Sequence, residues 1–242
     1  MTVAERRFAE RAKELKDLGL QERFARIYTT NLWSDPETRS GVGSRLDSTK
    51  VVRAKLPEAL RQLKARVMLD VPCGDFGWMQ HTDLTGIKYI GGDIVPSIVE
   101  QNQRRYANES RHFMQLDLTR DSLPDADVLL CRDCLVHLSY ANIRAVFANI
   151  ARSNLGHVLM TSFPGRRDNY DVADGDWRAL DFARGMCGGR GIVRRQIARR
   201  LARGSPPRHD QERSLDPSIW GLANRPRIDV SRPKHRSSDS QG

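Results

Sequence analysis

Acidic residues and glycines follow successive apolar segments of this 242-residue sequence. Asp70 and Gly74 come at the end of the first segment, and Asp93, Asp117 and Asp133 come at the ends of the next three. If these segments are parallel strands, their carboxyl ends share one edge of a sheet, where open α/β sheets bind ligands. Carboxylates there can accept hydrogen bonds from hydroxyl or amino groups, and a glycine lets the backbone approach a ligand closely. The pattern therefore predicts a site for a nucleoside-like ligand.

Three features of this pattern have a structural as well as a functional interpretation. Gly74 and Gly77 suit a tight turn beside a helix start, whose free N–H groups would face a ligand, but such a glycine pair alone is a weak signal. Asp93 follows Asp70 by 23 residues, where a carboxylate can accept both ribose hydroxyls, although a surface turn would also use an aspartate. Asp117 suits either an adenine amino group or an Asx turn. The recurrence at four segment ends supports a ligand site better than any single residue does.

Short apolar runs alternate with amphipathic segments in the first two thirds of the chain. We expect strands at Val67–Val71, Tyr89–Asp93, Phe113–Leu116, Ala126–Cys131 and His157–Phe163. We expect helices at residues 3–17, 48–65, 95–106 and 140–150, and a loop at residues 40–44. Ser139 is the predicted N-cap of the last helix, and Pro57 is expected to bend or divide the second. Alternating strands and helices predict an α/β fold with a mostly parallel sheet and helices on both faces.

Two side chains after the fourth strand are candidates for acid–base chemistry. Asp133 follows this strand, and His137 has an ordinary pKa of about 6.5, which suits proton acceptance near neutral pH. A histidine beside a helix start is nevertheless more often structural than catalytic. Cys131 and Cys134 are spaced like a metal or redox pair, but no second cysteine pair completes a four-ligand zinc site. We therefore expect no metal site.

Four motifs carry a resemblance to a known family. They are Leu69–Met79 (LDVPCGDFGWM), Tyr89–Ile94 (YIGGDI), Leu116–Thr119 (LDLT) and Cys131–Ser139 (CRDCLVHLS). In this order and spacing they resemble the motifs of class I S-adenosylmethionine-dependent methyltransferases. More narrowly, they resemble a bacterial branch that combines CGDF with RDCLVHLS. The resemblance covers residues 24–180 and implies a Rossmann-like, doubly wound sheet that binds S-adenosylmethionine.

The resemblance also implies roles for individual residues. The implied cofactor contacts, from the methionine part through the ribose to the adenine, are Asp70, Cys73 and Gly74, then Asp93 and Ile94, then Asp117 and Leu118. Asp133 would face the methyl-transfer site, and Asp133 or His137 would accept a proton if the acceptor is a hydroxyl or a protonated amine. Phe76 and Trp78 would either pack near the sulfonium or belong to the core. The resemblance says little about the acceptor, for which we expect a small molecule or a saccharide, with a protein as the alternative.

The net charge of +10 is concentrated near the C-terminus. Residues 1–182 contain 26 Lys+Arg and 25 Asp+Glu, whereas residues 183–242 contain 14 and 5. We therefore expect N-terminal helices and a Gly/Ser loop that cap the site (1–65), a Rossmann-like core (66–182), and a basic, disordered tail. A nucleic-acid partner would bind only through this tail. The tail composition also fits a reading frame that shifts near Met186, which would leave the last strands of the sheet missing.

Other function classes fit the sequence less well. A nicotinamide-dependent oxidoreductase needs G-x-G-x-x-G in its first turn, where this chain has Cys73–Trp78 (CGDFGW). A P-loop nucleotide hydrolase needs Gly-Lys-Ser/Thr, which residues 40–45 lack. No segment approaches the roughly 18 apolar residues of a membrane span, and no signal sequence is evident. We expect a cytoplasmic methyltransferase with reduced cysteines, with a nucleic-acid-binding protein or an oxidoreductase as the alternatives.

Overall fold

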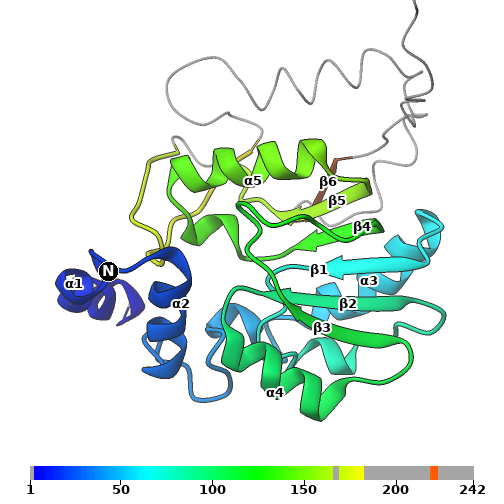
Figure 1. The fold of residues 1–242 in the computed structure, drawn as a ribbon, viewed down its shortest axis with the longest axis horizontal. Coiled ribbons are helices and arrows are strands. Elements are labelled where there is room, and N and C mark those ends of the chain that lie inside the picture. The colour runs from blue at the N-terminus through cyan, green and yellow to red at the C-terminus, as the bar shows by residue number, and fades with distance from the viewer. Residues whose placement is uncertain (1–2, 166–168, 183–218, 223–242) are drawn as a thin grey trace, which may run out of the picture.

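A single mixed sheet organises the chain. The computed structural model describes residues 3–165, 169–182 and 219–222. The strands lie in the order β3-β2-β1-β4-β5-β6 (Figure 1). Their bounds are Val67–Asp70 (β1), Lys88–Asp93 (β2), Arg111–Gln115 (β3), Ala126–Cys131 (β4), Leu155–Thr161 (β5) and Ile219–Leu222 (β6). Strands β1 to β5 are mutually parallel and β6 is antiparallel to β5, so the predicted α/β, doubly wound fold is confirmed.

Helices cover both faces of this sheet. The α-helices of the described residues are Val3–Leu15 (α1), Leu20–Thr29 (α2), Lys50–Gln62 (α3), Pro96–Tyr106 (α4) and Tyr140–Arg152 (α5). Three short 3-10 helices are Val42–Ser44 (η1), Met79–His81 (η2) and Leu135–His137 (η3). Figure 1 shows α1 and α2, in blue, beside one end of the strands. In the part of the chain described, no helix combines the length and apolar character needed to cross a bilayer.

Two apolar clusters hold these layers together. One cluster joins α3 to one face of the sheet, and the other joins α5 to the opposite face. Met68 and Leu69 are neighbours on β1, and both are completely buried, one in each cluster. This is the pattern of a parallel strand covered on both sides, for which near-continuous apolar residues are required. The apolar runs that predicted the strands therefore have a direct physical cause.

Helix boundaries agree with the sequence signals at two positions. Ser139 caps α5, since its hydroxyl accepts a hydrogen bond from the Asn142 N–H at 3.4 Å. Pro96 occupies the first turn of α4, where its missing N–H costs nothing. Pro57, by contrast, lies inside an undivided α3, so the predicted division of that helix is wrong. The loop predicted at residues 40–44 contains the 3-10 turn η1.

The turn after β1 lacks the α-helix start that the sequence predicted. Only η2 follows this turn, and it has three residues. Gly74 and Phe76 adopt φ values of +55° and +59°, which lie outside the right-handed helical region and so interrupt any helix here. The Asp75 carboxylate instead accepts the Gly77 N–H at 3.1 Å. A helix N-terminus is therefore not available to bind an anion at this position.

A strand also lies where the sequence predicted none. The segment 219–222 forms β6 and pairs with β5 over four residues. Its sequence, Ile-Trp-Gly-Leu, has no alternation of polar and apolar residues, so periodicity could not indicate it. The expectation of a tail without strands is wrong for these residues. The rest of 183–242, including Cys187 and Met186, lies outside the described residues.

Phe76 offers a test of the core beside the β1 turn. Its side chain is 1 % exposed, and its ring centroid lies 5.1 Å from that of Tyr89 and 5.2 Å from that of Phe113. We expect Phe76→Ala to lower the free energy of unfolding by about 3–5 kcal/mol, because truncating a buried phenylalanine leaves a cavity. Urea unfolding measures this change. The control Val51→Ala removes an exposed side chain of α3 and should cost well under 1 kcal/mol. Equal costs for both variants would contradict the packing.

Candidate functional site

A cavity lies at the carboxyl ends of the parallel strands, next to the reversal of strand order between β1 and β4. Its empty volume is about 1020 Å³ when the space open to solvent is included. Every residue that the sequence assigned to the site lines this cavity: Asp70, Cys73, Gly74, Asp93, Ile94, Asp117, Leu118, Asp133 and His137. These residues come from the four segments that follow β1, β2, β3 and β4. Only the pairing of these strands in one sheet brings them together.

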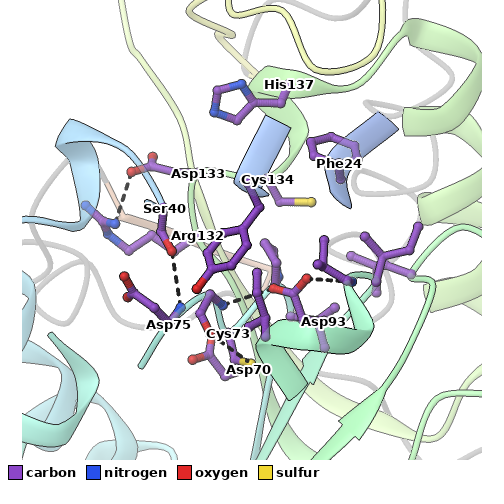
Figure 2. Close-up of a pocket in the computed structure, with 18 of the residues that line it drawn as sticks. Phe24, Ser40, Asp70, Cys73, Asp75, Asp93, Arg132, Asp133, Cys134 and His137 are labelled. Carbon is purple, nitrogen blue, oxygen red and sulfur yellow. Dashed lines mark hydrogen bonds and ion pairs between the residues drawn. The ribbon is translucent and has the colours of Figure 1, made fainter. Parts of the chain in front are cut away.

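The two groups of predicted residues lie on different sides of the cavity. In Figure 2, His137 lies at the top of the view and Asp133 at the left, whereas Asp70, Cys73 and Asp93 lie in the lower part. This arrangement separates the residues predicted to bind a cofactor from those predicted to act on an acceptor.

Asp70 is a buried carboxylate at the end of β1. Its Oδ2 accepts a hydrogen bond from the Tyr89 hydroxyl at 2.7 Å. Burial raises the pKa of Asp70 to about 7, because desolvation disfavours the charged form more than the Tyr89 hydrogen bond and the charge of Arg132 favour it. This carboxylate therefore gains from a cationic or hydrogen-bonding ligand.

Asp93 lies across the β1 turn from Asp70 and is 4 % exposed. Its carboxylate accepts the N–H groups of Gly74 at 3.1 Å and Val95 at 3.0 Å (Figure 2). Burial raises its pKa to about 6, while the backbone hydrogen bonds pull the pKa down. Backbone N–H donors do not use all the lone pairs of this carboxylate, so further donors can bind.

Asp117 makes the Asx turn that was one of its two predicted interpretations. Its Oδ1 accepts the Thr119 N–H at 2.9 Å, and its Oδ2 lies 3.1 Å from the Arg120 Nε. The turn aligns Leu118 with the cavity wall, and Asn149 of α5 donates to the Leu118 carbonyl at 3.0 Å. The two interpretations are compatible, since Asp117 also lines the cavity.

Asp133 is held by neighbours on several sides. Its backbone has a φ of +49°, and its N–H donates to the Thr161 hydroxyl at 2.9 Å. Its Oδ2 lies 3.0 Å from a guanidinium nitrogen of Arg132, and Arg132 also donates to the Gly43 carbonyl at 2.8 Å. A Cβ atom at position 43 would lie 2.6 Å from the same Oδ2, so only glycine fits against this carboxylate. The charge of Asp133 is thus paired and partly covered.

His137 has a defined tautomer. Its Nδ1 lies 2.9 Å from the carbonyl oxygen of Asp176, and a carbonyl can only accept, so Nδ1 must carry the proton. Nε2 then carries a lone pair in a residue that lines the cavity. The Trp33 ring packs against the imidazole with the centroids 4.7 Å apart. Burial lowers the pKa of His137, which favours the neutral form.

The N-terminal segment closes over the β1 turn. The Asp75 N–H donates to the Ser40 hydroxyl at 3.1 Å, and the Thr38 hydroxyl donates to the Asp75 carboxylate. A Cβ atom at Gly74 would lie 2.7 Å from the Ser40 Oγ, so the close contact depends on this glycine. Residues 38–45 therefore contact both the β1 turn and the Asp133 region.

Several lining residues escaped the sequence analysis. Phe24 of α2 and Arg132 line the cavity, and neither was assigned a role. Phe24 stood in a visible apolar cluster, but nothing local indicated that α2 folds over the strand ends. Of the two aromatic candidates, Trp78 lines the cavity, whereas Phe76 belongs to the core and not to the site.

No disulfide joins the cysteines of the described residues. Cys73, Cys131 and Cys134 are free thiols. Cys73 and Cys134 line the cavity, and Cys131 is buried beneath it. Within residues 3–165, 169–182 and 219–222, no group of three or more potential ligands could hold a metal ion.

Comparison with known proteins gives structural likenesses only. No protein-family model and no curated protein matches the chain. Human N-acetylserotonin methyltransferase in complex with SAM is 15% identical with a TM-score of 0.49, over 75% of this chain and 58% of that one. Magnesium protoporphyrin IX methyltransferase from Synechocystis PCC 6803 with bound SAH is 22% identical with a TM-score of 0.42, over 64% of this chain and 78% of that one. N-methyltransferase NodS from Bradyrhizobium japonicum WM9 in complex with S-adenosyl-l-homocysteine is 14% identical with a TM-score of 0.45, over 56% of this chain and 72% of that one.

The Asp70–Tyr89 hydrogen bond provides a test of the site's electrostatics. We expect Tyr89→Phe to raise the pKa of Asp70 by roughly 1–2 units, because a hydrogen bond to a charged group contributes about 1.5–3 kcal/mol and one unit is 1.36 kcal/mol. Carboxyl-carbon NMR titration measures the shift. Tyr106→Phe, on the same apolar cluster, is the matched control and should leave the pKa of Asp70 unchanged. An unchanged value in Tyr89→Phe would refute this coupling.

Proposed function

We propose that the protein is a methyltransferase that uses S-adenosylmethionine and acts on a hydroxyl group of a small molecule or saccharide. One observation carries the proposal: five carboxylates and a neutral histidine line a single cavity at the reversal of strand order. The resemblance of the four motifs supports the same cofactor. The methyltransferases named above contain SAM or SAH in their structures, and their names agree with the proposal.

The charge of the cavity favours a cationic ligand. Asp70, Asp75, Asp93, Asp117 and Asp133 line it, and Arg132 is the only basic side chain besides His137 among the lining residues. A dinucleotide brings a pyrophosphate, which usually binds at a helix N-terminus after the first strand. The three-residue η2 cannot supply one. A sulfonium with a neighbouring ammonium group is the better electrostatic match, which argues against the oxidoreductase alternative.

The lining residues fit the parts of S-adenosylmethionine. Asp93 retains hydrogen-bonding capacity for ribose hydroxyls, and burial raises the pKa of Asp70, so a cationic ligand beside it would favour its charged form. Leu116, Leu118 and Ile98 offer an apolar wall for the adenine. When bound, this cofactor supplies a methyl group activated by its sulfonium sulfur. The protein then has to align the acceptor and exclude water.

His137 is the stronger of the two candidate bases. Asp133 is ion-paired with Arg132 and covered by Gly43, whereas His137 lines the cavity and its Nε2 carries a lone pair. A lowered pKa keeps the imidazole neutral and ready to accept the proton of a hydroxyl. We assign proton acceptance to His137. Asp133 is assigned the role of positioning Arg132, which in turn binds the loop at Gly43.

The parts of the chain have separate tasks under this proposal. Residues 1–65 cap the site through α2 and the loop at 38–45, and residues 66–182 form the cofactor-binding core. Contacts of Ser40 and Thr38 with Asp75 support the capping role. Opening of this loop would admit the cofactor, and its closure would exclude water from the reaction.

Removing the Asp93 carboxylate tests the cofactor assignment. We expect Asp93→Ala to weaken S-adenosylmethionine binding about 10- to 100-fold, since each hydrogen bond to a charged acceptor contributes roughly 1.5–3 kcal/mol. Isothermal titration calorimetry measures the affinity. Asp125→Ala removes an exposed aspartate and is the control. Wild-type affinity in a folded Asp93→Ala protein would count against the site.

The raised pKa of Asp70 predicts a pH dependence of binding. A cationic ligand favours the charged carboxylate, so binding lowers the pKa of Asp70 and releases its proton wherever the free protein is protonated. Affinity should therefore be constant above about pH 7 and fall up to about tenfold per unit below it. Calorimetry between pH 5.5 and 7.5 tests this. Asp70→Asn should bind weakly, with a flatter pH profile, and an equally steep profile in that variant would assign the titration to another group.

A further inference from the structure

Residues 170–178, called here the strap, lie against η3 and the first turn of α5. His137 is the last residue of η3, and its imidazole contacts the strap directly. We propose that the strap is a positioning element that holds His137 with its proton on Nδ1 and its Nε2 lone pair in the cavity. The catalytic consequence rests on the function proposed above, whereas the positioning itself does not.

The strap fixes both the side chain and the backbone of His137. The Asp176 carbonyl accepts from Nδ1 at 2.9 Å, and the Gly175 N–H donates to the His137 carbonyl at 2.7 Å. The imidazole and its own peptide group are thus held by consecutive strap residues. Rotation of the ring would break the first bond, and displacement of η3 would break the second.

Arg178 anchors the strap to the other residues of η3. Its guanidinium donates to the carbonyls of Leu135 at 3.0 Å and Val136 at 2.9 Å, and its backbone N–H donates to Val136 at 3.1 Å. The side chain is completely buried and lies 5.5 Å from the centre of the Tyr140 ring. A buried cation is costly unless it is well hydrogen-bonded, so its presence here points to a demand for these carbonyl contacts.

The strap also supports the start of α5. The Asp174 carboxylate accepts the Ser139 N–H at 2.7 Å, and the Asp171 carboxylate accepts the Tyr140 N–H at 2.7 Å. Backbone N–H groups at a helix start lack partners within the helix, so side-chain acceptors fix its position. Because η3 leads directly into α5, these two bonds hold the chain just after His137, whereas Arg178 holds it just before His137.

Gly175 lets the strap pass between η3 and the N-terminal helices. Its φ is +91°, and a Cβ atom there would lie 2.5 Å from the Ile27 Cδ1 and 3.2 Å from the Phe8 Cε2. The strap is therefore wedged between α2 and His137. Trp33, which follows α2, packs on the imidazole. The ring is therefore held at Nδ1 by the strap and contacted by the Trp33 ring.

The surroundings set the charge state of the imidazole as well as its orientation. Burial lowers the pKa of His137, and the nearby charge of Arg178 lowers it further, whereas the Asp176 hydrogen bond and the charge of Asp133 raise it. Burial is the largest of these effects. Loosening the strap admits water, so we expect the pKa to rise toward the ordinary value of about 6.5.

This geometry serves the proton transfer that accompanies methylation of a hydroxyl group. With S-adenosylmethionine bound, the hydroxyl oxygen of the acceptor would form its bond to the methyl carbon while the carbon–sulfur bond breaks and leaves its electrons on sulfur. The hydroxyl proton would move to Nε2 of His137, which would leave the imidazole cationic with Nδ1 still donating to Asp176. Solvent then removes the proton.

Histidine ¹⁵N NMR of the full chain tests the strap without any substrate. The sequence has six histidines, and a His137→Gln sample identifies the His137 signals. At neutral pH we expect a protonated Nδ1 and an unprotonated Nε2 in the wild-type protein. In Arg178→Met we expect the ratio of the Nε2–H to the Nδ1–H tautomer to rise about tenfold, as the loss of one or two hydrogen bonds implies. Arg178→Lys should give an intermediate ratio.

Further variants keep the test decisive. Asp174→Ala removes one side-chain bond only and serves if Arg178→Met does not fold, with a smaller shift expected. Arg144→Met removes an exposed arginine of α5 outside the strap and should leave the spectrum unchanged. In the strap variants, calorimetry should find S-adenosylmethionine affinity within about twofold of wild type, and kcat should fall once an acceptor is supplied.

The outcomes separate the two proposals. A wild-type His137 that carries its proton on Nε2, or wild-type spectra in folded Arg178→Met and Asp174→Ala, would overturn the positioning role. The expected spectra in a protein that does not bind S-adenosylmethionine would leave the strap established and reject the proposed function. Binding of S-adenosylmethionine together with wild-type tautomers in the strap variants would support the proposed function and reject the positioning role of the strap.

Discussion

Burial of carboxylates at the strand ends is the constraint on which the site depends. Asp70 and Asp93 are almost completely excluded from water, and their pKa values rise to about 7 and about 6. Such groups stay charged only with donors or cations nearby. The Tyr89 hydroxyl and the N–H groups of the β1 turn provide part of this compensation. Under the proposed function, the hydroxyl and cationic groups of the ligand would provide the rest, so the site's specificity and its electrostatic cost would have the same origin.

The irregular segments around the sheet follow from the same geometry. The β1 turn places Gly74 against both Asp93 and Ser40, which a continuous helix after β1 would not allow. The loop at 38–45 then contacts the β1 turn and the Asp133 region, and the strap packs against η3, which carries His137. Each depends on a glycine at the point of closest approach, Gly43 beside Asp133 and Gly175 beside Ile27. Close backbone contacts together with α2 enclose the site.

Sequence reasoning succeeded where the signal was local. The apolar runs located five strands to within about two residues, and Ser139 marked the start of α5. The acidic residues at the strand ends predicted which positions would meet in the cavity, because parallel strands share one carboxyl edge. Sequence reasoning failed where tertiary contacts determine the conformation or the burial of a residue. The short β6 gains its strand from pairing with β5, and Phe76 is drawn into the core by Tyr89 and Phe113.

By itself, the sequence determined the layers of the fold and the acidic edge, since burial on both faces requires continuous apolar strands and parallel strands align their ends. Only the tertiary structure decided which groups are paired and which are available. Nothing in the sequence indicated that Arg132 donates to the Gly43 carbonyl, 89 residues away, or that Asp176, 39 residues away, sets the tautomer of His137. The physical reason is that these interactions are short-range in space and unrelated to separation along the chain. Their partners become defined only when the strap and the N-terminal helices pack around the strand ends.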